Sequence, residues 1–408
     1  MNNVYDVLAE RGFVEQVSDE AGIRALLEEP ITCYIGFDPT ASSFHVGNLV
    51  PIMALAHMQR HGHRPIAVVG GGTGMIGDPS GRSELRKMMT PEQIQANLEA
   101  QRAQLAHFLD LDDGKALVLN NADWLTKWNY IDFLREIGRH FSVNRMLAAE
   151  AYRARFETGL NFIEFNYMLL QSYDFLHLYR EYGCKLQMGG NDQWGNILAG
   201  VDLIRRVEEA TAYALVFPLI TTSSGAKMGK SAAGAVWLDS EQVSSYEYYQ
   251  YWINTEDPDV GRFLAMFTFL PLKDIAALSK LEGAKIREAK EVLAFEATKI
   301  LHGEEQAVKA REASRRLFAK GGAVGEGVPT AEASMDDLTV GIAVTELFNR
   351  VGLCPSRGAA RRLIQQGGAY VNGTRIDSVD LVITDQDLDG GAILLRAGKK
   401  RYCRVVVS

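Results

Sequence analysis

The chain has 408 residues, of which 47% are hydrophobic, so it can bury a large core and divide into two or three domains. Its formal net charge of −8 argues against a uniformly basic surface for nucleic acid. Apolar runs stay below the roughly 18 residues of a membrane span, and residues 1–6 lack a basic start followed by an apolar stretch. We therefore expect a cytoplasmic protein with no membrane partner.

The first 220 residues alternate strand and helix signals. Short apolar runs bounded by Gly, Pro or Asn lie at 31–37, 65–70, 115–120, 184–188 and 214–220. Helical patterns separate these runs, which favours an α/β domain with a Rossmann-like, doubly wound parallel sheet. Such a sheet binds its ligand at the carboxyl ends of the strands. We expect residues 1–220 to form this domain.

Residues 45–48 read His-Val-Gly-Asn and open an apolar helical pattern that runs from Leu49 to Met58. His45 and Asn48 are three residues apart, so they should share one face of the first turn. Free backbone N–H groups and the helix dipole favour an anion at such a place. Gly47 leaves room for a planar base or ribose to approach.

A lysine-rich turn reading Lys-Met-Gly-Lys-Ser occupies residues 227–231. Gly225, Gly229 and Gly234 predict a mobile loop, which can bring two ammonium groups onto a phosphoryl group as charge develops. Neither motif is specific alone, because glycine loops rich in lysine are usually solvated surface. Their order along the chain is the more informative feature.

In this order the two motifs resemble the HIGH and KMSKS signatures of class I aminoacyl-tRNA synthetases. Further segments, in the same order over nearly the whole chain, resemble those of bacterial tyrosyl-tRNA synthetases; they lie at residues 34–40, 70–74, 77–81, 165–174 and 189–196. Two positions depart from the signature names. Asn48 replaces a His and can still hydrogen-bond a ribose or phosphate oxygen, but it carries no positive charge. Gly229 replaces a Ser and is expected to loosen the loop while leaving both lysines.

The resemblance implies an L-tyrosine site. Tyr34 and Asp174 would hydrogen-bond the phenolic hydroxyl, and a carboxylate on an otherwise apolar helix is costly unless it has a partner. A site built around that hydroxyl rejects phenylalanine, because its own polar groups would be left unpaired. By the same resemblance, the α-ammonium would be bound by Asp78, Tyr167 and Gln171. Thr73 and Gln193 would help to position the amino acid.

The resemblance also implies a two-step reaction. The carboxylate of tyrosine attacks the α-phosphorus of ATP, giving tyrosyl-adenylate and pyrophosphate, and the terminal adenosine of tRNA-Tyr then takes the tyrosyl group. Mg²⁺ would accompany ATP through its phosphate oxygens. The residues implied in ATP binding are Gly36, Asp38, His45, Asn48, Gly190, Asp192 and Lys230. Those implied in catalysis by positioning and charge stabilisation are Thr40, His45, Lys227, Lys230, Ser231, Arg82 and Arg86.

Asp192 has a second interpretation. It precedes a helical pattern, so its side chain is predicted to cap that helix, whereas the family resemblance puts its carboxylate on the ATP ribose. Both roles are compatible in neighbouring geometry.

The four cysteines are Cys33, Cys184, Cys354 and Cys403, which are far apart and form no Cys-x-x-Cys pair. We expect reduced packing residues, with neither a zinc site nor a disulfide, and we assign no metal ligands.

The remainder of the chain divides into three parts. Residues 221–320 are expected to hold the signature loop and a helical connecting domain, since the pattern from Ser244 to Lys320 is helical. Residues 321–339 have a composition rich in Gly, Ala and Glu that is typical of a linker. Residues 340–408 are expected to form a small α+β RNA-binding domain.

This last part is locally basic, with ten Lys or Arg residues against six acids, a net of +4. A helix over Ile342 to Val351, an Arg-bearing second helix, and turns at 367–368 and 372–373 resemble a small RNA-binding fold shared with a ribosomal small-subunit protein. A basic module on an acidic body is what a local phosphate footprint looks like. The candidate tRNA contacts are Arg205, Arg206, Arg357, Arg361, Arg362, Lys399 and Lys400.

The resemblance further implies a homodimer, to whose interface the aromatic region from Trp124 to Phe141 could contribute. Three alternative functions remain open. Tryptophanyl-tRNA synthetases share the fold and both signatures, but Tyr34 with Asp174 and the basic final module favour tyrosine. A small-metabolite nucleotidyltransferase would have no need of an RNA-binding module. A non-catalytic RNA-binding relative disagrees with the intact Thr40, His45, Lys227 and Lys230.

Overall fold

The structure is a computed structural model that describes residues 3–80, 89–149, 152–153, 159–225, 228–231, 234–318, 329–398 and 401–407. By internal contacts it divides into two units: Met1–Gln242 with Glu256–Ala289, and Val243–Thr255 with Lys290–Ser408. Within the described ranges, every helix is too short or too polar to cross a membrane.

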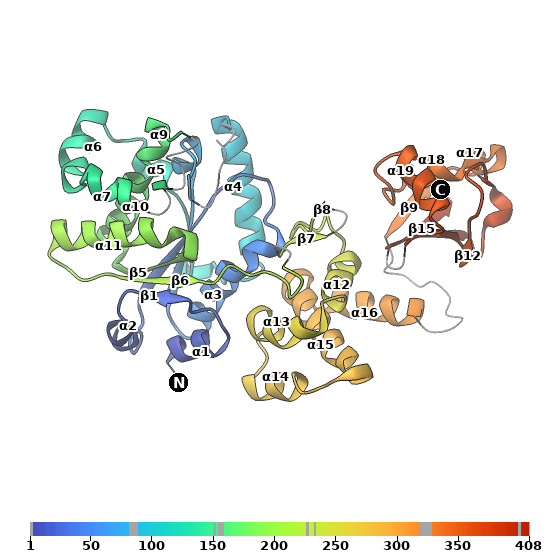
Figure 1. The fold of residues 1–408 in the computed structure, drawn as a ribbon, viewed down its shortest axis with the longest axis horizontal. Coiled ribbons are helices and arrows are strands. Elements are labelled where there is room, and N and C mark those ends of the chain that lie inside the picture. The colour runs from blue at the N-terminus through green and yellow to red at the C-terminus, as the bar shows by residue number, and fades with distance from the viewer. Residues whose placement is uncertain are drawn as a thin grey trace. The chain divides into compact units, whose positions relative to one another are not determined.

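The first unit is built on a six-stranded sheet with the order β1-β6-β5-β2-β3-β4 (Figure 1). Its strands are β1 (Gln16–Val17), β2 (Thr32–Phe37), β3 (Arg64–Val69), β4 (Leu117–Asn120), β5 (Cys184–Gly190) and β6 (Tyr213–Phe217). All neighbours are parallel except β1 and β6. The doubly wound parallel sheet expected from the sequence is confirmed, whereas β1 was not predicted because two residues carry no recognisable pattern.

Helices connect and cover these strands. Before β5 they are α1 (Val4–Glu10), α2 (Glu20–Leu26), α3 (Leu49–Arg60), α4 (Pro91–Leu105), α5 (Ala122–Leu125), α6 (Tyr130–Glu136), α7 (Val143–Ala148), α9 (Phe162–Phe165) and α10 (Tyr167–Tyr182). After β5 come α11 (Trp194–Glu208), α13 (Val260–Phe267) and α14 (Leu272–Leu278). Helices α10 and α11 pack on each other and on β5 and β6, and their buried side chains share a core with Tyr34, Ile66 and Val68 of the central strands.

The second unit begins with three helices, α12 (Ser245–Ile253), α15 (Ile286–His302) and α16 (Glu304–Phe318), of which α12 packs on α16. Together with α13 and α14 they confirm the helical pattern expected from Ser244 onward. All four cysteines of the chain are buried and free.

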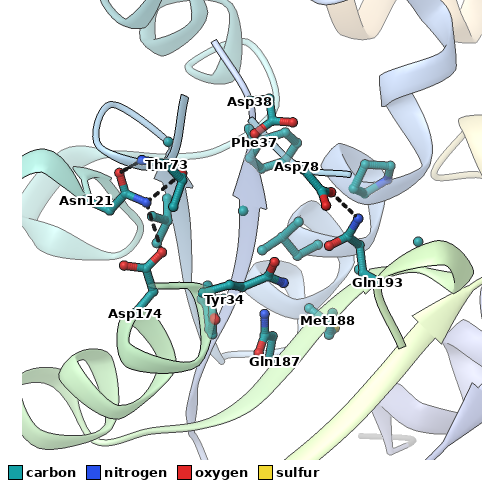
Figure 2. Close-up of a pocket in the computed structure, with 18 of the residues that line it drawn as sticks. Tyr34, Phe37, Asp38, Thr73, Asp78, Asn121, Asp174, Gln187, Met188 and Gln193 are labelled. Carbon is teal, nitrogen blue, oxygen red and sulfur yellow. Dashed lines mark hydrogen bonds between the residues drawn. The ribbon is translucent and has the colours of Figure 1, made fainter. Parts of the chain in front are cut away.

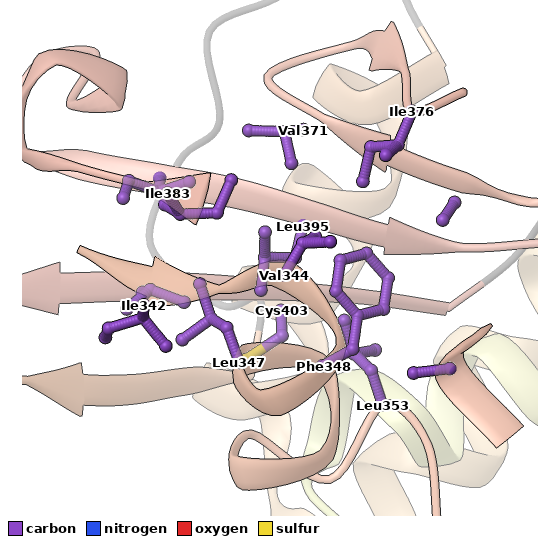
Figure 3. Packing of buried hydrophobic residues seen from close by; sticks show 14 of the residues in the cluster. Ile342, Val344, Leu347, Phe348, Leu353, Val371, Ile376, Ile383, Leu395 and Cys403 are labelled. Carbon is purple, nitrogen blue, oxygen red and sulfur yellow. The ribbon is translucent and has the colours of Figure 1, made fainter. Parts of the chain in front are cut away.

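The final part of this unit combines α17 (Met335–Val340), α18 (Val344–Arg350) and α19 (Arg357–Gln365) with two sheets. One sheet has the order β12-β11-β14-β15-β9, formed by β9 (Thr330–Ala333), β11 (Ala369–Val371), β12 (Thr374–Arg375), β14 (Ala392–Ala397) and β15 (Arg401–Val407). The other pairs β10 (Ile342–Ala343) with β13 (Val382–Ile383). Apolar side chains such as Val344, Phe348 and Leu395 fill the core between helices and sheet (Figure 3).

Two sequence expectations differ from this part of the structure. Residues 330–333, expected in a linker, form β9 and pair in parallel with β15. The helix expected from Ile342 begins at Val344, because Ile342 and Ala343 pair with β13 instead. The predicted turn at Asn372 and Gly373 is confirmed, with φ of 47° and 80°. The other domain boundaries stay predictions.

One buried cation ties α13 to the first residues of the chain. Arg11 is only 6% exposed, and its guanidinium donates to the carbonyls of Ala265 (2.8 Å), Thr268 (2.9 Å) and Leu270 (2.6 Å). These carbonyls lie at and beyond the end of α13, where a helix leaves its last C=O groups without intrahelical partners. Arg11 therefore supplies the C-terminal cap of α13 from a distant segment.

Arg11→Met should lower the free energy of unfolding by about 2–4 kcal/mol, since it leaves buried carbonyls unpaired. Urea and thermal unfolding of the full chain would measure the loss. The half-buried Arg24 is the matched control: it pairs with surface carboxylates such as Glu20 and lies over the ring of Tyr5, so Arg24→Met should lower the free energy of unfolding far less than Arg11→Met. Equal midpoints for the two variants would contradict the capping role.

Candidate active site

A cavity of about 140 Å³ opens at the carboxyl ends of β2, β3 and β5, where a doubly wound sheet binds its ligands (Figure 2). Tyr34 and Asp174, expected to act together, both line it. The structure brings ten of the sequence-predicted residues to this cavity: Tyr34, Gly36, Asp38, Thr73, Asp78, Tyr167, Gln171, Asp174, Gly190 and Gln193.

Asp174 is a buried carboxylate on α10, only 4% exposed. One of its oxygens accepts a hydrogen bond from Trp124 Nε1 (2.7 Å) and the other from Asn121 Nδ2 (2.9 Å). Burial raises the pKa of Asp174 to about 7, against the opposing effect of these two donors. A buried carboxylate at this position was expected to need a partner, and Asp174 has two, the side-chain N–H groups of Trp124 and Asn121.

Tyr34 lies in the middle of β2, 1% exposed, with its ring 5.3 Å from that of Phe175. Its hydroxyl is buried and has no hydrogen-bond partner among the described residues. Burial, with Asp174 nearby, raises the pKa of Tyr34 well above its ordinary value, so the phenol stays neutral. A buried hydroxyl without a partner beside a buried carboxylate leaves one donor and one acceptor for a ligand hydroxyl.

Asn121 and Trp124 were missed as site residues in the sequence analysis. Besides Asp174, Asn121 Nδ2 bonds Thr73 Oγ1 (2.9 Å), and its oxygen accepts from the Gly72 N–H (2.7 Å). It thereby joins the glycine-rich turn after β3 to α10. Asn121 comes directly after β4, at the carboxyl end of a parallel strand, where such sheets bind their ligands. This position could have identified it as a candidate site residue. Trp124 was expected to belong to a region that could contribute to the dimer interface. Trp124 itself is buried and donates a hydrogen bond to Asp174 instead.

Asp78 is the second buried carboxylate of the cavity, 6% exposed. It accepts from the Ser80 N–H (2.9 Å) and from Gln193 Nε2 (2.7 Å). Burial and the nearby Asp38 raise the pKa of Asp78 to about 6. Asp38 and Asp78 both line the cavity, and two carboxylates suit a cationic group of a ligand.

Three amide or hydroxyl side chains complete the floor. Tyr167 and Gln171 lie one turn apart on α10, on the same face as Asp174. Gln187, on β5, is a lining residue that the sequence analysis did not single out. The Oε1 atoms of Gln171 and Gln187 are buried and have no hydrogen-bond partner among the described residues.

The His45 motif has a different local structure from the one expected. His45 is the N-cap of a 3₁₀ turn, η1 (Val46–Asn48), that precedes α3. Its Nδ1 accepts from the Gly47 N–H (3.0 Å), and Asn48 Oδ1 accepts from the His45 N–H (3.0 Å). The expectation that these N–H groups are free for an anion is therefore wrong. With Nδ1 an acceptor, the ring proton lies on Nε2, so His45 itself is the donor.

The two signature motifs pack against each other. Gly229 has φ of +92°, and a Cβ added there would lie 2.8 Å from Gly47 N and 3.0 Å from His45 Nδ1. Likewise, a Cβ on Gly47 would lie 3.1 Å from the Met228 carbonyl. Both glycines permit a close backbone contact between the motifs, while the roles expected for them, a looser loop and room for a base or ribose, stay predictions.

Several expected catalytic residues lie outside the described residues, namely Arg82, Arg86 and Lys227. Lys230 and Ser231 are described by their backbone, which forms β7 (Lys230–Ser231) and pairs with β8 (Gly234–Ala235).

Thr40, His45, Asn48 and Asp192 are described but do not line the cavity. The predicted N-cap role of Asp192 is wrong. Asp192 lies in a 3₁₀ turn, η5 (Asn191–Gln193), and the residue at the N-cap position of α11 is Gln193. The Asp192 carboxylate instead accepts from Gln193 Nε2 (3.0 Å).

The candidate RNA contacts fall into two groups. Arg205 and Arg206 on α11 are exposed or half-buried and share the carboxylate of Asp202 at 2.6 and 2.8 Å. Arg357, Arg361 and Arg362 are exposed on α19, and Arg357 pairs with Glu346 at 2.8 Å. Lys399 and Lys400 lie outside the described residues.

Known proteins resemble this chain over its whole length. Residues 26–319 match the family described as tRNA synthetases class I (W and Y), and residues 322–405 match the tyrosine–tRNA ligase SYY-like C-terminal domain. The tyrosine–tRNA ligase of Desulfosudis oleivorans is 58% identical over 99% of both chains. That of Clostridium botulinum strain Loch Maree is 54% identical over the whole of both chains.

Among solved structures, a C-terminally truncated mitochondrial tyrosyl-tRNA synthetase of Aspergillus nidulans is 30% identical, with a TM-score of 0.70 over 78% of this chain and 95% of that one. A tryptophanyl-tRNA synthetase of Encephalitozoon cuniculi shares the fold at 15% identity and a TM-score of 0.57. The alternative functions left open by the sequence are thereby resolved in favour of tyrosine. The chain belongs to the class I aminoacyl-tRNA synthetases and, among them, to the tyrosine–tRNA ligases.

Proposed function

We propose that the cavity lined by Tyr34 and Asp174 is the site where this ligase activates tyrosine with ATP to tyrosyl-adenylate, before the tyrosyl group passes to the 3′-terminal adenosine of tRNA-Tyr. The observation that carries this assignment is a pair in one cavity: a buried hydroxyl that has no hydrogen-bond partner within the described part of the chain, and a buried carboxylate. A phenol fits both, because its O–H donates to Asp174 and its oxygen accepts from Tyr34. Phenylalanine would leave both groups unpaired.

The α-ammonium of tyrosine is assigned to Asp78, Tyr167 and Gln171. Asp78 provides the negative charge, while Gln171 Oε1, which has no partner among the residues that the structure describes, supplies a further acceptor. Thr73 and Gln193 position the amino acid through their contacts with Asn121 and Asp78, respectively. The amino acid is then held at both ends, which leaves its carboxylate to meet ATP.

ATP is assigned to Gly36, Asp38, Gly190 and Asp192 at the cavity edge and to His45, Asn48 and Lys230 at the paired signatures. The reaction needs no protein nucleophile, since the tyrosine carboxylate is already ionised. His45 Nε2–H, Thr40, Lys227, Lys230 and Ser231 stabilise the charge on the displaced phosphates, and Arg82 and Arg86 bind the pyrophosphate. Mg²⁺ enters with ATP through phosphate oxygens; the described residues hold no group of three or more His, Cys, Asp or Glu side chains that would make a resident metal site.

The tRNA is assigned to two surfaces. Arg205 and Arg206 contact backbone phosphates near the acceptor end, where one shared Asp202 leaves the pair a net positive charge. Arg357, Arg361 and Arg362 on the exposed face of α19 contact a second region, together with Lys399 and Lys400. Phosphate contacts of this kind give affinity and orientation.

The ligase is further proposed to act in the cytoplasm as a homodimer. Four exposed apolar side chains support the homodimer: Tyr130 is 58% exposed, Ile131 64%, Val143 56% and Phe162 69%. Large exposed apolar side chains of this kind are candidates for a protein–protein interface. Part of the region assigned to the interface, around Tyr130, therefore keeps that role.

Tyr34→Phe should weaken tyrosine binding about fivefold to thirtyfold, corresponding to one hydrogen bond of about 1–2 kcal/mol. Tyrosine-dependent pyrophosphate exchange, compared with exchange on phenylalanine, measures the effect. Phenylalanine should be used no worse than before, because it makes no bond to Tyr34. Parallel losses for the two amino acids would show that Tyr34 only shapes the core.

The pKa of Asp78, raised to about 6, predicts how kcat/KM for tyrosine depends on pH. Above pH 7 the carboxylate is ionised and attracts the ammonium; below pH 6 it is protonated and the attraction is lost. The ratio of wild-type to Asp78→Asn kcat/KM should therefore be large at pH 8 and fall toward one near pH 5. Titration of Asp174 affects both proteins and cancels in the ratio. A ratio independent of pH would refute the assignment.

Gly229→Ser, which restores the residue of the signature name, should reduce adenylate formation at least tenfold, because a side chain at φ +92° would press on Gly47 and His45. Gly225→Ser is the matched control: it has a similar φ of +81°, but a Cβ there meets nothing within 4 Å. Stopped-flow measurement of adenylate formation would compare the two. Equal effects would mean that backbone strain, not the contact with the His45 motif, decides the outcome.

A further inference from the structure

A cluster of three charged side chains on the segment that starts α13 contacts the chain just before the lysine-bearing turn. Asp259 is 3% exposed, and its carboxylate accepts from the Ser223 N–H and from the Arg262 guanidinium, both at 2.8 Å. Arg262 also donates to the Thr221 carbonyl (2.5 Å). These contacts hold the backbone of residues 221–223.

Glu256 holds the side chains of the same segment. One carboxylate oxygen accepts from Ser223 Oγ (2.5 Å) and the other from Ser224 Oγ (2.8 Å). The two hydroxyl bonds lower the pKa of Glu256, so its ionised form is the one that is bound. We call Glu256, Asp259 and Arg262 the stem anchor.

Asp259 occupies the N-cap position of α13 but makes no capping hydrogen bond there. An Asp at this position normally accepts from the N–H groups of its own helix. Here its oxygens are directed to Ser223 and Arg262 instead. The bond to Arg262 stays within α13, but the bond from the Ser223 N–H ties this buried carboxylate to another segment, which indicates a role outside the helix.

The opposite end of the turn is held by the His45 motif. The Val236 N–H donates to Gly229 O (3.0 Å), the Val46 N–H to Val236 O (2.9 Å), and Trp237 forms an antiparallel bridge with His45. The residues between Ser224 and Met228 are thus bounded on one side by the stem anchor and on the other by the signature motif.

We propose that the stem anchor consists of positioning residues for tyrosine activation: Glu256, Asp259 and Arg262 fix the first end of the lysine-bearing turn so that Lys227 and Lys230 meet the phosphates in the transition state. This inference rests on the charge-stabilising role proposed above for those lysines. Fixing both ends of a short segment reduces the conformations that must be lost when its groups converge on the reacting phosphates. Loss of the anchor should therefore slow activation without weakening tyrosine binding.

The test uses Glu256→Ala, because Glu256 is exposed and its loss should not prevent folding. Glu256→Ala should slow single-turnover adenylate formation about tenfold and leave the tyrosine Kd unchanged. Glu256→Gln keeps the shape of the side chain but only one of its two acceptor oxygens, so it should recover part of the rate. Glu282→Ala, an exposed carboxylate at the start of another turn in the same unit, should have the wild-type rate.

Ser223→Ala with Ser224→Ala removes the same contacts from the other side. This double variant should match Glu256→Ala, and combining all three substitutions should cost no more than either set alone. The anchor would be overturned if the rate losses of the two sets multiplied in the combined variant, if the double serine variant kept the wild-type rate, or if it lost tyrosine affinity as much as rate.

Lys230→Ala separates this inference from the function on which it rests. Lys230→Ala should slow activation more than tenfold with tyrosine binding intact, and adding Glu256→Ala to it should have little further effect. An unchanged rate in Lys230→Ala would refute the lysine role, whereas a slow Lys230→Ala beside a normal Glu256→Ala would refute the anchor alone.

Discussion

The tyrosine cavity depends on how a single carboxylate is held inside the protein. Asp174 can be buried because Trp124 Nε1 and Asn121 Nδ2 each donate to one of its oxygens. Desolvation of an isolated carboxylate costs several kcal/mol, so either donor alone would leave an oxygen poorly satisfied. Asn121 also bonds the turn after β3, and the carboxylate therefore couples three segments that have no sequence proximity. The bonds that allow this carboxylate to be buried therefore also hold the surrounding core together.

The two signature motifs are joined by backbone contact more than by side chains. Gly47 and Gly229 approach each other closely, and the side chains of His45 and Asn48 cap the intervening turn. This arrangement gives a physical account of both departures from the signature names. Asn48 can accept from the His45 N–H as a cap, a bond that requires no charge. Gly229 fits a space that a Ser side chain would not.

Much of the fold could be predicted because its strands are long and well bounded. Strands β2, β3 and β5 are largely apolar runs bounded by turn residues, so their type and their place in a parallel sheet followed from the pattern. The two-residue strands β1 and β10 could not be predicted, since pairing partners far along the chain define them. The same reason explains why β9 was assigned to a linker: its short polar sequence becomes a strand only beside β15.

Site residues that belong to local sequence motifs could be predicted, whereas those brought to the site by tertiary packing could not. Tyr34, Asp78 and Asp174 belong to motifs that the family resemblance carries, and they do meet in one cavity. Asn121 and Trp124 follow β4 and reach Asp174 only through tertiary packing, for which no local pattern exists. Asp192 was misassigned as a cap because it lies within a 3₁₀ turn that ends at Gln193, the residue at the N-cap position of the helix.

The strand order has a consequence for how this cavity comes into being. Strand β2, which carries Tyr34, pairs on one edge with β3, close in sequence, and on the other with β5, which begins only at Cys184. A nascent chain can therefore form β2 and β3 early but must keep the apolar second edge of β2 unpaired until β5 and α10 have been synthesised. Pairings of such high contact order fold slowly and expose aggregation-prone edges meanwhile. Free tyrosine, which binds only the completed arrangement, would stabilise the folded product by mass action.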